Sequence, residues 1–284
     1  MLDNHPRLAV ANDTHFIPRL PYLTQKEDTP LTPEIIAWVS NYHRFQRLGL
    51  SNDIVEKAAA RSYTYTEFVS ALYSEYGHMH DKSLAGEKTP DYVRHLPLLH
   101  TLFPHARIIH IIRDGRDVAL SALQWAHSKK GPGKFALWQE EPVAVCALWW
   151  VWQVGSGLRD GAQLGKTSYR EIRYEDLLAQ PETELRELCD FLGLPYASEM
   201  LNYHVGKMNA QPGLSAKKAW LPPTTGLRNW RTEMPERDLL LFEALAGNLL
   251  SILGYQLSAD SFPQNIKETA SKCQQWWQSE MARR

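Results

Sequence analysis

Cysteine is scarce in this 284-residue sequence: only Cys146, Cys189 and Cys273 are present, and no two of them form a C-x-x-C pair. The scarcity excludes a disulfide scaffold, and the spacing gives no sign of a cysteine-based zinc or redox site. We therefore expect buried or inert thiols in a reducing compartment. An excess of positive charge is also lacking, since 31 Lys and Arg residues stand against 32 Asp and Glu residues. Nucleic acid is therefore not an expected partner, and any polyanion site must be local.

Long hydrophobic runs are absent as well. No apolar run reaches the roughly 18 residues that a membrane span needs, so we expect none. The first twenty residues lack a cationic, hydrophobic and cleavable signal, which favours a cytoplasmic protein. At 44% hydrophobic and 22% charged residues, the composition is that of a soluble globular protein with a sizeable core. No linker or internal repeat divides it, so we expect a single domain over residues 1–284.

Several common catalytic motifs are missing. The chain contains no H-E-x-x-H, G-x-S-x-G or G-x-G-x-x-G pattern and no G-x-x-x-x-G-K-[ST] phosphate loop. The first glycine is Gly49, so no glycine-rich nucleotide loop lies at this amino terminus. His78 and His80 form an H-x-H pair, but no further ligand stands at metal spacing, and a surface pair is the simpler interpretation. We expect no bound metal.

What is present is an alternation of helical and strand patterns. Residues 1–33 are rich in proline and polar residues and predict irregular chain. The strand predictions are Arg107–Ile112, a short β-branched run, and Thr167–Arg173. The helix predictions, from apolar residues at helical spacing, are Pro33–Leu48, Thr66–Tyr76, the segment after Gly115, Pro142–Arg159, Pro181–Leu192 with a Gly193 stop, and Pro235–Leu253. The tail from Gln256 onward has only weak periodicity. This order predicts an α/β fold with a parallel sheet.

The first candidate site is the segment IIHIIRDGRDVALS. Arg113 stands at the carboxyl end of a predicted buried strand, where open α/β sheets bind ligands, and the free N–H groups of the next helix point toward it. Ser121 lies two turns into that helix, so its hydroxyl reaches the same anion only if the anion lies along the helix side. In the alternative, Arg113 pairs with Asp114 or Asp117, and the serine bonds back to its own helix.

A second candidate is the stretch from Gly206 to Arg231. It contains no acidic residue, and its basic residues are Lys207, Lys217, Lys218, Arg228 and Arg231. In a chain of otherwise balanced charge, this is a plausible cationic flap over a phosphate or sulfate. An ordinary solvated loop is the commoner outcome for such a charge run.

A third candidate is the pair Glu87 and Lys88, fixed by Gly86 before it and Pro90 two residues after it. A carboxylate beside an ammonium group can serve as a general base with an electrophilic neighbour when both project into a cleft. The commoner alternative is a surface salt bridge.

Taken together, three segments resemble the sulfotransferases that use 3′-phosphoadenosine-5′-phosphosulfate (PAPS). They are Gly86–Ser121, Arg170–Pro195 and Leu227–Arg231, and they occur in the family's order. The element R-D-G-R-D-V-A-L-S is the most specific, because I-x-x-R-D-x-R-D-x-x-x-S is the family's 3′-phosphate signature. The resemblance covers most of the chain and is greatest to bacterial members.

The resemblance implies roles for particular residues. Arg113 and Ser121 match the pair that holds the 3′-phosphate, and Tyr174 matches a residue near the adenine. Trp230 and Arg231, and less closely Arg228, match the loop that closes over the nucleotide. Glu87 resembles the catalytic base of the heparan-type members, with Lys88 beside it. The base of the cytosolic branch is a histidine in K-T-H-L-P, and His95 is the alternative candidate here.

The implied reaction is the in-line transfer of a sulfuryl group from PAPS, without a metal, to a hydroxyl or amine of a small molecule, lipid or glycan. Positioning and cationic stabilisation would provide most of the catalysis. One alternative is a truncated, non-catalytic relative that binds the nucleotide or acts as a scaffold. A nucleotide kinase is another, but the 3′-phosphate signature counts against it. The sequence chooses no particular acceptor and no oligomeric state.

The resemblance also implies a phosphate-loop-type three-layer fold, with a central parallel sheet between helices. It assigns residues 1–104 to a mostly helical acceptor side, 105–255 to the nucleotide-binding core and 256–284 to a tail. The family's first strand and its 5′-phosphosulfate loop have no counterpart, because the chain opens where the helix after that loop ends. Either an internal methionine was taken as the start or the loop was lost, and the completeness of the remaining nucleotide site favours the first. The tryptophans of Trp149–Trp152 are expected mainly in the core, near the acceptor side.

Overall fold

The structure is a computed structural model, and it describes all residues except 22, 24–28, 127–129, 206–223 and 225–227. The chain divides into two compact units, which are described separately. The first comprises residues 1–110, 160–172 and 176–224, and the second comprises 111–159, 173–175 and 225–284.

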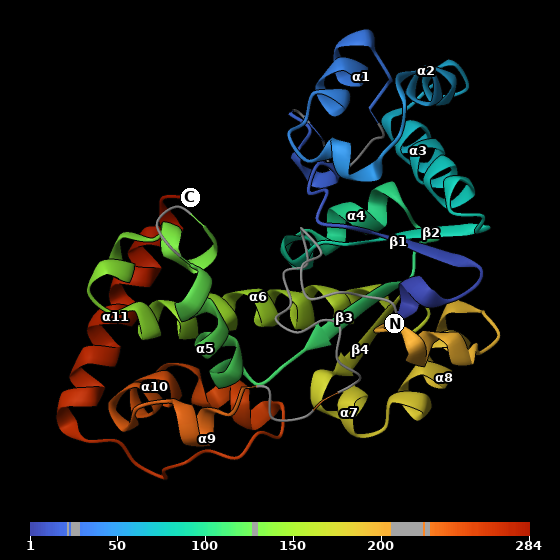
Figure 1. Ribbon diagram of the computed structural model, residues 1–284. Helices are drawn as coiled ribbons and strands as arrows, with labels where there is room; N and C mark the ends of the chain where they lie inside the picture. The colour runs from blue at the N-terminus through green and yellow to red at the C-terminus, as the bar shows by residue number, and fades with distance from the viewer. Residues whose placement is uncertain (22, 24–28, 127–129, 206–223, 225–227) are drawn as a thin grey trace. The chain divides into compact units, whose positions relative to one another are not determined.

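A parallel strand pair lies at the centre of the first unit. Strand β1 (Leu8–Asn12) pairs with β2 (Leu84–Lys88) in a register that sets Ala11 opposite Glu87 and Asn12 opposite Lys88. Figure 1 shows the two strands side by side. The prediction of irregular chain over residues 1–33 is therefore wrong for β1. Its hydrogen-bonding partner lies far along the chain, so no local pattern indicates it.

Helices of the first unit enclose an apolar core with one face of this strand pair. They are α1 (Pro33–Ser40), α2 (Asn52–Ala60), α3 (Tyr65–Met79) and α4 (Leu96–Leu102), with short 3₁₀ turns η1 (Leu2–Asn4), η2 (Ile17–Arg19), η3 (Phe45–Leu48) and η4 (Pro90–Arg94). A capping box begins α3: Thr64 accepts from the Glu67 N–H, and the Glu67 carboxylate accepts from the Thr64 N–H. The predicted helix over Thr66–Tyr76 is confirmed and slightly extended.

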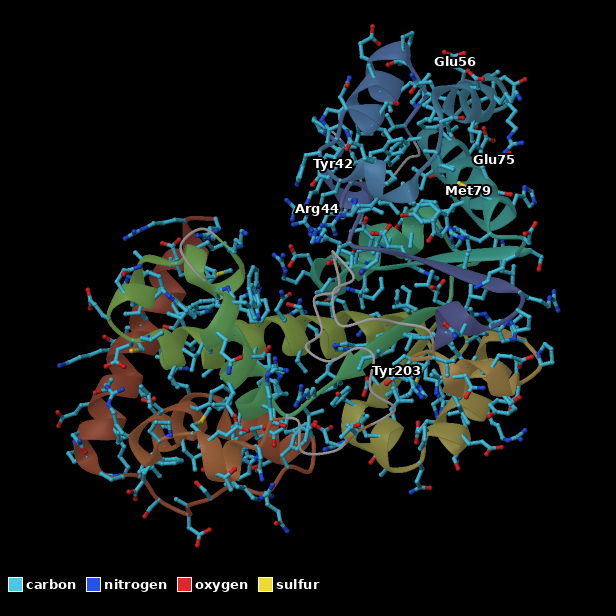
Figure 2. All side chains as sticks on the ribbon, in the orientation of Figure 1. Tyr42, Arg44, Glu56, Glu75, Met79 and Tyr203 are labelled. Carbon is cyan, nitrogen blue, oxygen red and sulfur yellow. The ribbon has the colours of Figure 1, made fainter. Side chains whose placement is uncertain are left out.

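The predicted helix over Pro33–Leu48 is interrupted. It stops at Ser40, and the turn that carries Tyr42 and Arg44 (Figure 2) leads into the separate 3₁₀ turn η3. Tyr42 and Phe45 both pack against Phe16, with ring centroids 6.5 and 5.8 Å away. Tertiary packing on Phe16 thus overrides a helical periodicity that runs on past Ser40.

A second strand pair joins β3 (Ile108–Ile112) to β4 (Tyr169–Arg173), and both strands were predicted. In the first unit, β4, α8 (Pro181–Leu192) and the turn η7 (Ser198–Asn202) share a core with Leu8 of β1. Helix α8 has its predicted bounds, and Gly193 ends it in the left-handed conformation at φ 69°. The boundary between the two units passes through both strands and through helix α6.

The second unit is built mainly of helices. They are α5 (Gly115–Trp125), α6 (Pro142–Leu164), α9 (Trp230–Glu233), α10 (Glu236–Ile252) and α11 (Gln264–Ala282), with the turns η5 (Gly131–Lys134) and η6 (Ala136–Gln139) and the start of α7 (Tyr174–Ala179). The weak periodicity of the tail concealed α11. This helix places Cys273 and Trp277 in a core shared with α6 and α10, and Trp152 lies at the edge of the same core.

The start of α5 packs directly against the Trp150 ring and therefore requires a glycine. A Cβ atom added to Gly115 would meet the Trp150 ring at 2.5 Å and Phe242 at 2.8 Å, so only glycine lets the helix start so close to them. The Trp150 indole N–H donates to the Arg113 carbonyl at 3.2 Å. The core interpretation of the tryptophan stretch is confirmed for Trp150, which is 3% exposed.

All three cysteines are free and buried, as predicted. Burial raises the pKa of the Cys146 thiol far above its usual value, so this thiol stays protonated and unreactive. Within the described ranges, no helix is both long enough and apolar enough to cross a bilayer.

Candidate active site

The first group of polar side chains lies in the second unit, directly after β3. The Arg113 guanidinium donates from Nη2 to Asp117 Oδ2 at 3.1 Å and lies 4.7 Å from the centroid of the Tyr174 ring. Its Nε is buried and has no hydrogen-bond partner among the residues that the structure describes. The ion pair that the sequence offered as an alternative is therefore present, but it leaves one donor of Arg113 unsatisfied.

Arg228 shows the same feature. It is half-buried, and its Nε is also buried, with no partner in the described part of the chain. Burial lowers the pKa of Arg228, and the positive charge of Arg113 lowers it further. Two guanidinium groups that repel each other and each retain a buried free donor have the chemistry to bind an anion, because buried donors of this kind are nearly always satisfied.

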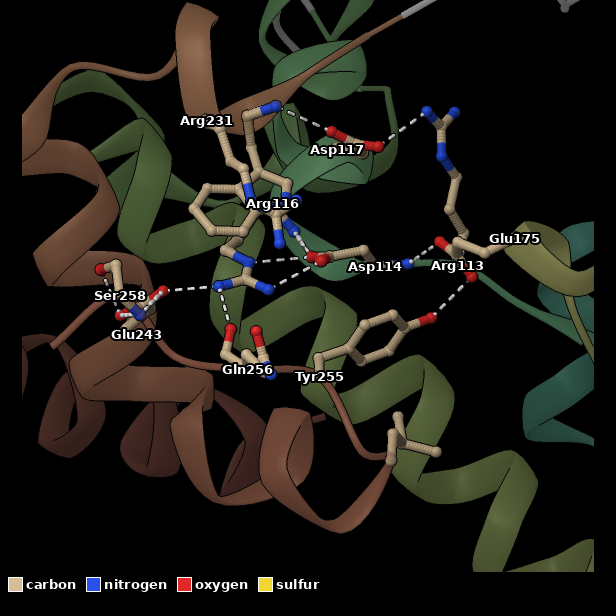
Figure 3. Close-up of polar contacts among 12 residues, drawn as sticks. Arg113, Asp114, Arg116, Asp117, Glu175, Arg231, Glu243, Tyr255, Gln256 and Ser258 are labelled. Carbon is tan, nitrogen blue, oxygen red and sulfur yellow. Dashed lines mark hydrogen bonds and ion pairs between the residues drawn. The ribbon is translucent and has the colours of Figure 1, made fainter. Parts of the chain in front are cut away.

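A buried ion network supports Arg113 from the adjoining helix. Arg116, only 1% exposed, forms two hydrogen bonds to Asp114, at 3.0 and 2.8 Å, and an ion pair with Glu243 at 2.6 Å. It also donates to the Gln256 carbonyl at 2.9 Å, and Ser258 donates to Glu243 (Figure 3). The network fixes the start of α5 against α10. The sequence analysis did not identify Arg116 or Glu243 as important. The only sign of Arg116 in the sequence is its place as the second arginine of R-D-G-R-D.

We expect Glu243→Ala to lower the free energy of unfolding by about 3 kcal/mol, because it leaves a buried arginine with an incomplete set of partners. Urea denaturation measures this loss. The control is Arg237→Ala, which breaks the exposed Arg237–Glu141 pair of the same unit and should cost about 1 kcal/mol or less. Equal losses in the two variants would contradict the structural role of the buried network.

Trp230 and Arg231 lie beside this network. The backbone N–H of Trp230 donates to Asp117 Oδ1 at 3.0 Å. The centroid of the Trp230 ring lies 3.6 Å from the guanidinium carbon of Arg116 and 4.4 Å from that of Arg231. Trp230 is buried and Arg231 is exposed. Asp117 thus connects Arg113 to the segment that carries Arg228, which the sequence placed in the same site.

Ser121 of the predicted anion site is not brought to Arg113 by any described contact. Ser121 is half-buried two turns along α5, and among the described residues no hydrogen bond joins it to Arg113. Lys207, Lys217 and Lys218 of the predicted cationic flap lie outside the described residues.

The second group lies in the first unit, around Glu87 of β2. The Thr14 hydroxyl is 2.6 Å from both carboxylate oxygens, and the Thr14 N–H donates to Oε1 at 3.0 Å. The hydroxyls of Tyr73 and Thr89 donate to Oε2 and Oε1 respectively. We call Thr14, Tyr73 and Thr89 the hydroxyl triad. Sequence reasoning found Glu87 but not these partners, since Thr14 and Tyr73 are distant in sequence.

The turn after β1 directs its backbone toward Glu87. Asp13 and His15 adopt positive φ angles of 58° and 63°, which is uncommon for residues other than glycine and often marks a functional site. Between them, Thr14 turns both its N–H and its hydroxyl onto the carboxylate. Burial raises the pKa of Glu87, and the hydrogen bonds from Thr14 and Thr89 offset part of that increase. A carboxylate with a raised pKa is suited to accepting a proton near neutral pH.

Lys88 and His95 are not bonded to Glu87. Lys88 pairs with Asp13 at 3.1 Å, which is a surface salt bridge of the kind that the sequence offered as an alternative. Glu87 takes no part in it, because adjacent strand residues point to opposite faces. Burial lowers the pKa of His95, and the charges of Arg94 and Arg19 lower it further.

The described residues contain no group of three His, Cys, Asp or Glu side chains that could hold a metal ion.

Comparison with known proteins relates the chain to a protein family and to two curated relatives. A sequence profile of the Sulfotransferase family matches residues 1–198. Protein-tyrosine sulfotransferase A of Caenorhabditis elegans is 23% identical over 212 residues, covering 73% of this chain and 49% of that protein. The Protein-tyrosine sulfotransferase of Drosophila melanogaster is 22% identical over 265 residues, covering 90% of this chain and 48% of that protein. The chain spans about half the length of these curated relatives.

Solved structures share the fold. The sulfotransferase domain from the curacin biosynthetic pathway aligns with a TM-score of 0.56 and 21% identity, covering 90% of this chain and 92% of that one. The sulfotransferase domain from the Synechococcus PCC 7002 olefin synthase aligns with a TM-score of 0.50 and 18% identity, covering 95% and 86%. At these identities the likeness concerns the fold, and it confirms the predicted α/β class.

Proposed function

The chain belongs to the sulfotransferase family, and we propose that it transfers a sulfuryl group from PAPS to a hydroxyl or amine acceptor. The observation that carries the proposal is the pair of buried, unpartnered Nε donors on Arg113 and Arg228. A phosphate dianion between them would offset their mutual repulsion and satisfy both donors. The 3′-phosphate of PAPS has this chemistry.

The surrounding residues suit a nucleotide phosphate. Tyr174, whose ring lies against Arg113, limits the movement of that guanidinium. Asp117 holds one terminal nitrogen of Arg113 and thereby leaves Nε for the ligand. Ser121 and Arg231 are proposed to add further donors to the nucleotide, and Trp230 is proposed to form part of the loop that closes over it.

Glu87 is proposed as the general base. Its carboxylate takes the proton from the acceptor hydroxyl or amine, the acceptor atom forms a bond to sulfur, and the bond from sulfur to the phosphate oxygen breaks. The products are the sulfated acceptor and 3′-phosphoadenosine-5′-phosphate (PAP). Lys88 pairs with Asp13 on the opposite face of the strand and is given no part in this step, and His95 remains the alternative base. The acceptor is proposed to be a small molecule, a lipid or a glycan; two relatives named for protein tyrosine add a phenol to the acceptors worth testing.

Binding of PAP against AMP tests the nucleotide proposal. The two ligands differ only in the 3′-phosphate, so we expect PAP to bind about tenfold to a hundredfold more tightly by calorimetry. The advantage should shrink as salt increases, because it is electrostatic. Equal affinities at low salt would contradict the assignment of Arg113 and Arg228. Binding of PAP without any transfer to a panel of alcohols, phenols and amines would favour the non-catalytic alternative.

A further inference from the structure

The two oxygens of the Glu87 carboxylate carry unequal numbers of hydrogen bonds. Oε1 accepts from the N–H of Thr14 at 3.0 Å, more weakly from the N–H of His15 at 3.4 Å, and from the Thr89 hydroxyl. Oε2 accepts from the Tyr73 hydroxyl. A carboxylate oxygen has two lone-pair sites, so the two N–H groups and Thr89 already saturate Oε1. Oε2 has one site besides the one that Tyr73 occupies, and this site is open only when the Thr14 hydroxyl, 2.6 Å away, donates elsewhere.

The Thr14 hydroxyl can serve more than one partner. It lies 2.6 Å from each carboxylate oxygen and 3.1 Å from the Tyr73 hydroxyl, but it has a single proton to donate. Thr14 is fully buried, so these are its available partners. The hydroxyl triad can therefore redistribute its hydrogen bonds when the charge on Glu87 changes.

Packing places the Tyr73 hydroxyl at Oε2. The Tyr73 ring stacks on Phe16 with centroids 6.5 Å apart and planes 18° from parallel. Phe16 is fully buried, so the ring has a fixed packing partner besides the hydroxyl bond. Tyr73→Phe should consequently keep the packing and lose only the donor.

The other titratable groups near Glu87 are engaged elsewhere. Tyr65 donates to the Ile17 carbonyl at 3.0 Å, and Tyr92 accepts from the Ile17 N–H at 3.2 Å. The negative charge of Glu87 contributes to the raised pKa of both phenols, after burial. The His15 ring is 3.7 Å from Asp91, and burial, followed by the charge of Arg44, lowers its pKa to about 4. At neutral pH His15 is therefore uncharged.

We propose that Oε2 is the atom of Glu87 that receives the acceptor's proton, and that Tyr73 is a positioning residue that aims this oxygen and stabilises its ionised form. The inference rests on the proposed function. When the Thr14 hydroxyl donates to the Tyr73 oxygen instead of to Oε2, the acceptor O–H or N–H occupies the second lone-pair site of Oε2 and transfers its proton there. The Tyr73 hydroxyl then turns to donate to Thr14, since a protonated Oε2 is a weaker acceptor.

The test is the titration of Glu87, followed by NMR in protein labelled with ¹³C at the glutamate carboxyl carbon and assigned by Glu87→Gln. We expect Tyr73→Phe to move the midpoint upward by about one pH unit, because a hydrogen bond that favours the charged form is lost. An unmoved or lowered midpoint would overturn the proposal. Tyr76→Phe is the control, because it removes a hydroxyl from the same helix. Among the described residues, that hydroxyl forms no hydrogen bond to Glu87, so the Glu87 midpoint of this variant should match the wild type.

A second pair of variants keeps the test decisive if Tyr73→Phe is poorly folded. Thr14→Val removes a hydroxyl with little change of shape and should also raise the midpoint, while Thr14→Ser restores the hydroxyl and should return it toward the wild-type value. In a protein that transfers sulfuryl groups, the acid limb of kcat/KM should move with the NMR midpoint. Failure of the proposed function would appear as a loss of discrimination between PAP and AMP, whereas failure of this inference would leave that discrimination intact and the midpoint unmoved.

Discussion

Replacing Arg113 with alanine is expected to weaken PAP binding about a hundredfold, because the 3′-phosphate loses a charge-assisted donor. Arg113 is suited to this role because Nε is buried without a partner while Nη2 is held by Asp117. Arg113→Lys should recover only part of the affinity, since a single ammonium group cannot bond to Asp117 and to the phosphate in the same geometry. Calorimetry with PAP and AMP measures both effects.

The matched control is Arg237→Ala, which removes an exposed arginine of the same unit and should leave PAP affinity unchanged. Ser121→Ala is predicted to weaken binding to a smaller extent. The AMP affinity of Arg113→Ala should stay near that of the wild type, because AMP has no 3′-phosphate to lose. If Arg113→Ala and Ser121→Ala both bind PAP as tightly as the wild type does, the site assignment is wrong.

The second large effect is expected from Glu87→Gln, which should reduce kcat for sulfuryl transfer by about 10²- to 10⁴-fold. The amide keeps the shape of the side chain but cannot accept the acceptor's proton. PAP affinity should change less than about twofold. Transfer of radiolabelled sulfate from PAPS to an acceptor found by panel screening provides the assay.

The pH dependence has a definite sign. A general base works only when ionised, so activity should rise with pH through the Glu87 pKa. Because burial raises that pKa above its reference value of 4.5, the acid limb of kcat/KM should lie at higher pH than for an exposed glutamate. The limb should disappear in Glu87→Gln, leaving a low and flat residual activity.

Two further variants separate Glu87 from its alternatives. Glu75→Gln, on α3 (Figure 2), alters a carboxylate that pairs with Arg61 at 2.7 Å and should leave kcat unchanged. His95→Gln should also have a small effect when Glu87 is the base. A large loss in His95→Gln together with near-normal activity in Glu87→Gln would transfer the role to the histidine.

Much of the fold followed from local patterns. Strand β3, helix α8 and its Gly193 stop were predicted, because a β-branched run, an amphipathic stripe and a left-handed glycine each have a local signature. The motif at Arg113 was found for the same reason. Its residues are neighbours in sequence, so their spacing alone places a guanidinium at the end of a strand.

Other features depended on distant partners. Strand β1 has an unremarkable sequence and exists through its pairing with β2, which lies more than seventy residues away. Helix α1 stops where packing on Phe16 takes over. Helix α11 has a weak pattern and is held by the core that contains Trp277. In each case the deciding contact joins segments that no local window contains.

The candidate site, like the fold, was predictable from the sequence only in part. The sequence by itself determined an α/β chain of balanced charge, and it predicted the chemistry: a strand-end arginine in a segment that resembles a phosphate-binding motif, and a glutamate as the candidate base. Only the tertiary structure decided how those groups behave. It set a second guanidinium near Arg113, buried Arg116 against Glu243, and closed the hydroxyl triad around Glu87. The reason is that side-chain identity is local, whereas desolvation and hydrogen bonding depend on segments that meet only when the chain has folded.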